Sequence, residues 1–314
     1  MEIALYALLF VAGLGLALVA SDVAVAYTRA LAAALGAPPF IVGVVLVSLG
    51  TDLPEIANSI AAHVQGEGDV NVGDSIGSTL TQYTLVLGLF PLVAGTLLID
   101  RLQVGLVTVL TMGGLAMTAL FVANGWLGRW EGLALVLAWA FFTWIVVRVI
   151  PGSKPEEPPG VRLAGRWGQA GVVLGALAVV GVGATVAVRS LVRLAELAGV
   201  PEFVIAFFGA SFGTSAPEIV VDFTALLRGS PAIALGDALG SSLIDATLSI
   251  GIGPLVAPAE VTPSLALTGA LYTLGAVAVV GALLGGRRRH DRLSMAVLLG
   301  LYLLAYAVLL SAED

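Results

Sequence analysis

The chain has 314 residues, of which 59% are hydrophobic and only 11% are charged. Because a soluble domain carries about 25% charged residues, this composition excludes a soluble globular protein and predicts an all-α membrane protein. Cysteine is absent, which excludes disulfides and thiolate chemistry, and the net charge of -7 is no indication of nucleic-acid binding.

Ten apolar segments are long enough to span a bilayer, since a spanning helix needs roughly 20 residues. They lie at residues 3–35, 39–64, 71–97, 103–123, 129–150, 168–198, 202–227, 232–257, 263–285 and 293–311. Residues 151–167 are polar and rich in proline, which predicts a linker between a first half (1–150) and a second half (168–314). The two histidines, His63 and His290, are expected to lie outside the core.

The basic residues predict the orientation, because lysine and arginine gather in cytoplasmic loops. If the N-terminus lies outside, ten of the fourteen basic residues fall on the cytoplasmic side: Arg101, Arg148, Lys154, Arg162, Arg166, Arg228, Arg287, Arg288, Arg289 and Arg292. We therefore expect an integral membrane protein with an external N-terminus and a cytoplasmic linker.

An internal repeat organises the chain. When the sequence is shifted by 163 residues, Gly36–Val93 aligns with Gly199–Val256 without a gap, and 22 of the 58 aligned positions are identical. Matched positions include prolines and acids, which membrane composition alone would not align. Five spans in each half is an odd number, so the second copy enters the membrane from the opposite side. This is the inverted-repeat organisation of secondary transporters.

Two repeated stretches, residues 48–55 and 211–218, each place a glycine, a proline and a carboxylate in an apolar span. Proline cannot donate the helical hydrogen bond, so we expect the first stretch to break near Gly50–Thr51. That break would free carbonyl oxygens of Ser48 and Thr51, and its mate would free those of Ser211 and Thr214. Side chains of Asp52, Glu55, Ser215 and Glu218 are expected beside them.

Polar residues also recur every fourth position in the spans that follow these stretches. They form two matching stripes: Asp74, Ser78 and Gln82, and then Asp237, Ser241 and Asp245. Gly73/Gly77 and Gly236/Gly240 are expected to let helices approach closely. A set of carboxylate, hydroxyl and carbonyl oxygens suits hard cations such as Na⁺, Ca²⁺ or Mg²⁺.

Acids inside apolar spans are functional candidates by default, and this applies most strongly to Glu55, Glu218, Asp245 and Asp52. Asp74 and Asp237 have an alternative role, as caps of their helices. Asp22 and Asp222 are expected to be structural or peripheral.

At the repeated motifs the sequence resembles the calcium/cation antiporter superfamily, and in particular prokaryotic sodium/calcium exchangers. The matching text is Gly-Thr-Asp-Leu-Pro-Glu (50–55) with Gly-Asp-Ser-Ile-Gly-Ser (73–78), and Gly-Thr-Ser-Ala-Pro-Glu (213–218) with Gly-Asp-Ala-Leu-Gly-Ser (236–241). The resemblance implies a secondary active antiporter in a prokaryotic plasma membrane. It would exchange Na⁺ for Ca²⁺ by alternating access, with no enzymatic activity and no cofactor; its partners would be inorganic cations and membrane lipid, and no protein partner can be inferred.

The resemblance also implies roles for residues. Glu55 and Glu218 would be the shared carboxylates for calcium and sodium. The further ligands would be the carbonyls of Ser48, Thr51, Ser211 and Thr214, and the side chains of Ser78, Ser215, Ser241, Gln82 and Asp245.

Several positions depart from the family pattern. Asp52 stands where the family has serine or threonine, Gln82 where it has asparagine or aspartate, and Asp74 and Asp237 where it has asparagine. Thr185 replaces an acid near the start of span six. The additional acids leave open a proton-coupled exchanger, or one for another divalent ion. The Gly-Asp pairs also leave an intramembrane aspartyl protease as a remote alternative, although the Tyr-Asp that such enzymes need is absent.

Overall fold

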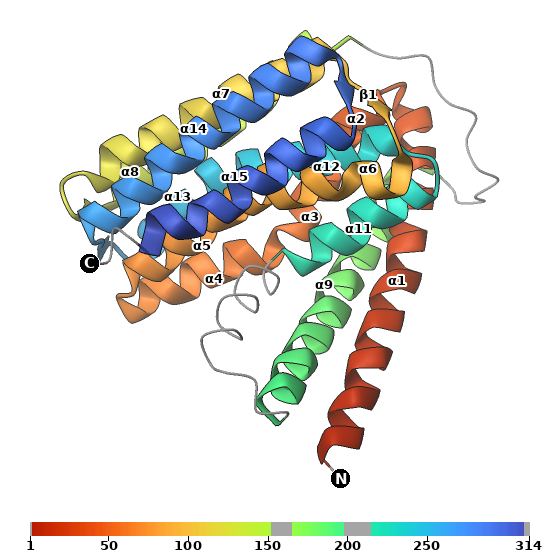
Figure 1. Cartoon of the computed structure of the whole chain (residues 1–314), viewed down its shortest axis with the longest axis horizontal. Coiled ribbons are helices and arrows are strands. Elements are labelled where there is room, and N and C mark those ends of the chain that lie inside the picture. Colours follow the sequence, from red (N-terminus) through yellow and green to blue (C-terminus); the bar gives the residue numbers. More distant parts are fainter. Residues whose placement is uncertain (1, 152–164, 198–214, 311–314) are drawn as a thin grey trace. The chain divides into compact units, whose positions relative to one another are not determined.

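The structure is a computed structural model that describes residues 2–151, 165–197 and 215–310. The described chain is almost entirely helical (Figure 1), as the composition predicts. It divides into two compact units. Unit 1 is built from residues 1–53 and 152–237, and unit 2 from residues 54–151 and 238–314.

Unit 1 is dominated by two long helices, α1 (Glu2–Leu35) and α9 (Gly165–Leu197), which run side by side (Figure 1). At 1.5 Å per residue each is about 50 Å long, well beyond the roughly 30 Å of a bilayer core. They cross at two glycines: a methyl group on Gly13 would lie 2.7 Å from the carbonyl oxygen of Gly183. The absence of side chains at this crossing lets the two backbones touch.

The rest of unit 1 is made of short helical segments. These are α2 (Pro39–Val42), the π-helix η1 (Gly43–Val47), α3 (Ser48–Thr51), α11 (Ala216–Leu227) and the beginning of α12 (Pro231–Ile244). A second close crossing joins α2 and η1 to α12: a methyl group on Gly236 would lie 2.4 Å from the carbonyl oxygen of Phe40, and one on Gly43 of η1 would lie 2.7 Å from that of Ile233. This contact confirms the close approach predicted for Gly236.

Unit 2 contains helices from residues 54–151 of the first half and residues 238–314 of the second half. Its helices are α4 (Leu53–Gln65, apart from its first residue), α5 (Gly68–Thr81), η2 (Gln82–Val86), α6 (Leu87–Ala94), α7 (Arg101–Val122), α8 (Arg129–Val149), η3 (Asp245–Ser249), α13 (Ile250–Val256), α14 (Pro263–Arg287) and α15 (Arg292–Leu310). Val72, Ile76, Leu127, Leu135 and Ile250 belong to its apolar core, to which α5, β2, α8 and α13 contribute.

Two short antiparallel ladders tie the loops of unit 2 together at opposite ends of α7. β1 (Leu97–Leu98) pairs with β4 (Arg289–His290), just before α7 begins, and β2 (Trp126–Leu127) pairs with β3 (Ala259–Glu260), after α7 ends. Each ladder therefore joins loops that lie more than a hundred residues apart in the sequence.

The 163-residue repeat reappears in the boundaries of the elements. α5 and η2 begin at residues 68 and 82, and α12 and η3 begin at residues 231 and 245, 163 residues later in each case. The glycines after α4 and α11, Gly66 and Gly229, are also repeat mates and both adopt positive φ, +79° and +70°. This is the left-handed geometry that ends a helix and favours glycine.

Two repeat-related prolines, Pro91 in α6 and Pro254 in α13, each deprive a buried carbonyl of its helical donor. The carbonyl freed by Pro91 belongs to Leu87 and accepts a hydrogen bond from His290 Nε2 at 2.6 Å. The carbonyl freed by Pro254 belongs to Ile250 and accepts one from Asn71 Nδ2 at 3.1 Å. In each helix, a side chain from another element thus supplies the hydrogen-bond donor that the proline lacks.

Both histidines lie in the core, and the expectation that they lie outside it is wrong. His290 is fully buried, and His63 is 1% exposed with its Nδ1 2.8 Å from the carbonyl oxygen of Ala257. Each ring lies at a backbone carbonyl, that of Leu87 inside a helical span for His290 and that of Ala257 just after α13 for His63.

The predicted close approach is also wrong for Gly73 and Gly77. No atom lies within 4 Å of a methyl group built on either residue. They line an open groove beside α14, with Leu265, Ala266 and Gly269 on its other wall. The two glycines have the same spacing in both repeat copies, but of Gly73, Gly77 and Gly236 only Gly236 meets a neighbouring backbone.

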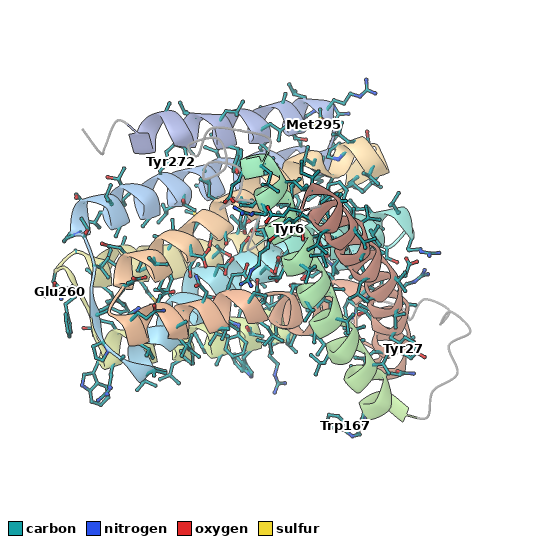
Figure 2. All side chains as sticks on the ribbon, turned by 90° about the horizontal axis from the view of Figure 1, so that it is seen from below. Tyr6, Tyr27, Trp167, Glu260, Tyr272 and Met295 are labelled. Atoms are coloured by element: carbon teal, nitrogen blue, oxygen red, sulfur yellow. The ribbon has the colours of Figure 1, made fainter. Side chains whose placement is uncertain are left out.

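Within the described residues, seven helices are long and apolar enough to span a membrane, or eight if the bent pair Pro39–Thr51 and Leu53–Gln65 is counted as one. Large apolar side chains face outwards on several of them, and Trp167 at the start of α9 stands clear of the ribbon (Figure 2). A lipid bilayer suits such a surface. The predicted span 202–227 lies partly outside the described residues, and the count of ten stays a prediction.

Candidate functional site

The first repeated stretch breaks at Asp52. α3 ends at Thr51, Asp52 has φ -78° and ψ 3°, and α4 begins at Leu53 with a bend of 45°. Pro54 causes the break, because it cannot donate to the carbonyl of Gly50 and disfavours helical geometry in the residue before it. Ser215, the repeat mate of Asp52, has a similar backbone geometry, with φ -81° and ψ 10° immediately before α11.

The break therefore lies one residue beyond the predicted position, Gly50–Thr51. Gly50 serves packing instead, since a methyl group there would lie 2.4 Å from Leu177 Cδ1 of α9. The carbonyl of Ser48 is not freed as expected: it accepts hydrogen bonds from the Asp52 amide at 2.9 Å and from Thr51 Oγ1 at 3.1 Å.

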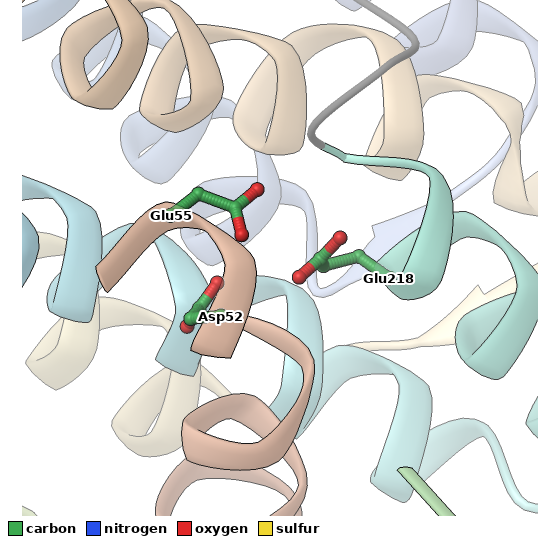
Figure 3. Close-up of side chains that lie close together, drawn as sticks. All are labelled: Asp52, Glu55 and Glu218. Atoms are coloured by element: carbon green, nitrogen blue, oxygen red, sulfur yellow. The ribbon is translucent and has the colours of Figure 1, made fainter. Parts of the chain in front are cut away.

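Unit 1 brings two fully buried carboxylates together at its helix breaks. Asp52 follows α3 and Glu218 lies in the first turn of α11, and their nearest ligand oxygens come within 4.8 Å of each other (Figure 3). Ser215, directly before α11, is also buried, and its hydroxyl has no hydrogen-bond partner among the described residues. The N-terminal end of a helix favours negative charge, so this end of α11 suits an ionised Glu218.

Unit 2 contains three further acids named from the sequence, Glu55, Asp74 and Asp245. Glu55 lies in the first turn of α4, is 2% exposed and accepts a hydrogen bond from its own backbone amide. The charges of Asp245 and Asp74 lie near enough to act on it. Ser78 and Ser241 are buried one turn before Gln82 and Asp245.

Gln82 and Asp245 each occupy the first position of a π-helix, η2 and η3. Such turns are rare and occur frequently at functional sites. The threonines two residues later, Thr84 and Thr247, each donate a side-chain hydrogen bond to the carbonyl four residues back, at Leu80 and Leu243. Sequence reasoning missed the π-helices, although the conserved spacing of these two threonines within the repeat is a signal that could have pointed to them.

The alternative role considered for Asp74 and Asp237, as helix caps, is wrong. Both lie more than a turn inside their helices, α5 and α12. Asp74 accepts a hydrogen bond from Asn58 Nδ2 at 2.7 Å, and Asp237 accepts one from Thr51 Oγ1 at 3.3 Å. Asp222, which was expected to be structural or peripheral, is fully buried and contacts Asp237.

Two predicted ligands, Ser211 and Thr214, lie outside the described residues. The other ten are described, and every one of them is buried. They are Ser48, Thr51, Asp52, Glu55, Ser78, Gln82, Ser215, Glu218, Ser241 and Asp245. Their donor atoms are oxygens, the ligand type that hard cations prefer.

Apolar helices that break at buried carboxylates, and that recur at one spacing along the chain, define the class of secondary transporters. The profile of a known family, the sodium/calcium exchanger protein family, matches residues 5–148 and 168–311. The match covers most of both halves. The chain therefore belongs to the sodium/calcium exchanger family, which is one of cation antiporters rather than of enzymes.

Individual relatives agree with this assignment. The chain is 29% identical over 290 residues to the inner membrane protein YrbG of Escherichia coli, with 89% of this chain and 88% of YrbG covered. It is 28% identical over 303 residues to the putative antiporter CaxA of Alkalimonas amylolytica, with 91% and 93% covered. A solved structure of the sodium-calcium exchanger NCX_Mj has the same fold, with a TM-score of 0.81 at 23% identity over 97% of this chain and 99% of that one.

Proposed function

We propose that this protein is a secondary active antiporter that exchanges Na⁺ for Ca²⁺ by alternating access. The observation that carries the proposal is the pair formed by Asp52 and Glu218. Both carboxylates are fully buried, lie within 4.8 Å of each other and stand at helix breaks. Two acids placed this way in an apolar interior repel each other unless a cation or a proton lies between them.

Glu55 and Glu218 would be the carboxylates that calcium and sodium share, and Asp52 would supply a third charge. Further ligands would come from the backbone carbonyls at the two breaks and from the stripes that end at the π-helices. These are Thr51, Ser211 and Thr214, followed by Ser78, Gln82, Ser215, Ser241 and Asp245.

The proposed architecture has ten spans in two inverted repeats of five, with halves 1–150 and 168–314 and a cytoplasmic linker at 151–167. The N-terminus lies outside, and the protein resides in a prokaryotic plasma membrane. The arginines of residues 287–292 support this orientation, because they flank the ladder of β1 with β4 on one side of unit 2.

A flux assay with purified protein in lipid vesicles tests the exchange. We expect Na⁺-loaded vesicles in Na⁺-free medium to take up Ca²⁺, and Glu55→Gln or Glu218→Gln to reduce the uptake to the level of empty vesicles. Glu260→Gln, a neutralised loop glutamate, is the matched control and should transport normally. Normal uptake by both buried variants would refute the site.

A second candidate keeps the fold but couples Ca²⁺, or another divalent ion, to protons. Asp52 favours it, since this acid stands where the resembled family has serine or threonine. Uptake driven by a pH gradient without sodium, and lost in Asp52→Ser, would support proton coupling. Uptake that requires sodium and persists in Asp52→Ser would exclude it.

A further inference from the structure

A second pair of buried acids in unit 1 is not among the ligands assigned above. Asp222 of α11 and Asp237 of α12 are both fully buried, and their carboxyl groups lie at hydrogen-bonding distance from each other. Asp237 Oδ1 is also 3.3 Å from Thr51 Oγ1. Apart from the Asp237 carboxyl group, no hydrogen-bond partner among the described residues reaches either oxygen of Asp222.

The first repeat copy has different residues and different hydrogen bonds at the positions that correspond to Asp222 and Asp237. The mate of Asp237 is Asp74, whose carboxylate receives the Asn58 amide at 2.7 Å. The mate of Asp222 is Ser59, a neutral residue whose hydroxyl accepts a hydrogen bond from the Gly253 amide. At these two positions the second copy thus has two acids and the first has one, and Asp237 meets a second carboxyl group where Asp74 meets an amide donor.

The oxygens around this pair outnumber the protons available to them. Thr51 Oγ1 has a single proton and three acceptors within reach, namely Asp237 Oδ1 and the carbonyls of Val47, at 3.2 Å, and Ser48, at 3.1 Å. When that proton points to a carbonyl, the Thr51 oxygen faces Asp237 as a lone-pair donor. One proton shared between the two carboxyl groups would satisfy two of their four oxygens and leave the other two without a proton.

We propose that Asp222, Asp237 and the Thr51 hydroxyl bind a second divalent cation, separate from the one held by Glu218. Two carboxylates balance its charge, and an all-oxygen set suits Ca²⁺ or Mg²⁺. Thr51 links the positions, because its carbonyl belongs to the proposed transport site and its side chain to this one. The proposal rests on the proposed function only for the assignment of the other ion to Glu218.

Equilibrium binding of radioactive Ca²⁺ to the purified full chain in Na⁺-free buffer tests the proposal. We expect two ions per wild-type chain and one in Asp222→Asn, in Asp237→Asn and in Glu218→Gln. Asp22→Asn is the matched control, because Asp22 is an exposed acid of the same unit that pairs with Arg228. It should retain both ions.

One ion per wild-type chain, lost in Glu218→Gln and kept in Asp222→Asn, would overturn the second position and leave the proposed function standing. One ion lost in Asp222→Asn and kept in Glu218→Gln would support the second position and overturn the transport site. If the aspartate variants fail to fold, thermal unfolding of Glu218→Gln decides: Ca²⁺ should still raise its midpoint, and an unchanged midpoint would refute the proposal.

Discussion

The carbonyl freed by Pro91 offers a quantitative test of how the kinked helices are held. His290→Leu preserves the approximate volume of the fully buried ring but removes the Nε2 donor that lies 2.6 Å from the carbonyl oxygen of Leu87. A buried acceptor left without a donor costs about 1–3 kcal/mol. At about 2 °C per kcal/mol, the thermal midpoint in detergent should fall by roughly 2–6 °C.

A double-mutant cycle tests whether the Leu87 carbonyl needs His290 because Pro91 lacks an amide donor. Pro91→Ala restores an amide donor four residues after Leu87, so the carbonyl keeps a partner when His290 is lost. We therefore expect His290→Leu to cost about 1–3 kcal/mol less in the Pro91→Ala background, while effects on packing cancel. An equal loss in both backgrounds would refute the reasoning.

The chain offers a control and a replicate for this cycle. His63→Leu also removes an imidazole from a backbone carbonyl, that of the partly buried Ala257, but no proline stands four residues later, so its effect should add to that of Pro91→Ala. The cycle of Asn71→Leu with Pro254→Ala should reproduce the coupling in the second repeat copy, because Asn71 donates to Ile250.

Two further predictions follow from the same structure. Burial lowers the pKa of His290 below its ordinary value of 6.5, against the smaller opposing effects of the Leu87 carbonyl and the Asp291 charge. As the pH falls through 6.5, the unfolded chain therefore binds more protons than the folded chain, and the stability should decrease. The thermal midpoint of His290→Gln should depend less on pH between 8 and 5 than that of the wild type. Gly236→Ala places a methyl group 2.4 Å from the Phe40 carbonyl oxygen and should cost about 1–3 kcal/mol or more, whereas its repeat mate Gly73→Ala meets open space and should gain up to about 1 kcal/mol of helix propensity; equal thermal midpoints for the two variants would contradict the structure.

The sequence predicts the helical membrane class, the repeat and the burial of the acids because each depends on local composition or on identity at a fixed spacing. Pro54 and Pro217 reveal that the helices break, since proline alters its own backbone. The role of Gly50 depends on a tertiary contact, its packing against Leu177 of α9. No local signal distinguishes a glycine that packs from one that bends.

The same limit explains the errors at Gly73, His63 and His290. A small residue in a repeated motif indicates that a close approach is allowed, but the neighbour that makes it lies elsewhere in the chain. The histidines look peripheral because imidazole is polar and both lie near the ends of predicted spans. In the structure, His290 fills the hydrogen-bonding gap that Pro91 leaves at Leu87, and neither residue alone predicts the pairing.

Divergence between the two repeat copies shows where this chain departs from a symmetric design. In the repeat alignment Asp52 corresponds to Ser215, Gln82 to Asp245, and Ser59 to Asp222. Each copy therefore has acids at positions where the other copy has a neutral residue. Asp52 and Asp222 add to Glu218 and Asp237, so the described part of unit 1 contains four fully buried carboxylates. Such a concentration of negative charge is stable only when cations or protons occupy it. The ions bound at these four acids should therefore determine both what the protein carries and how stable its empty form is.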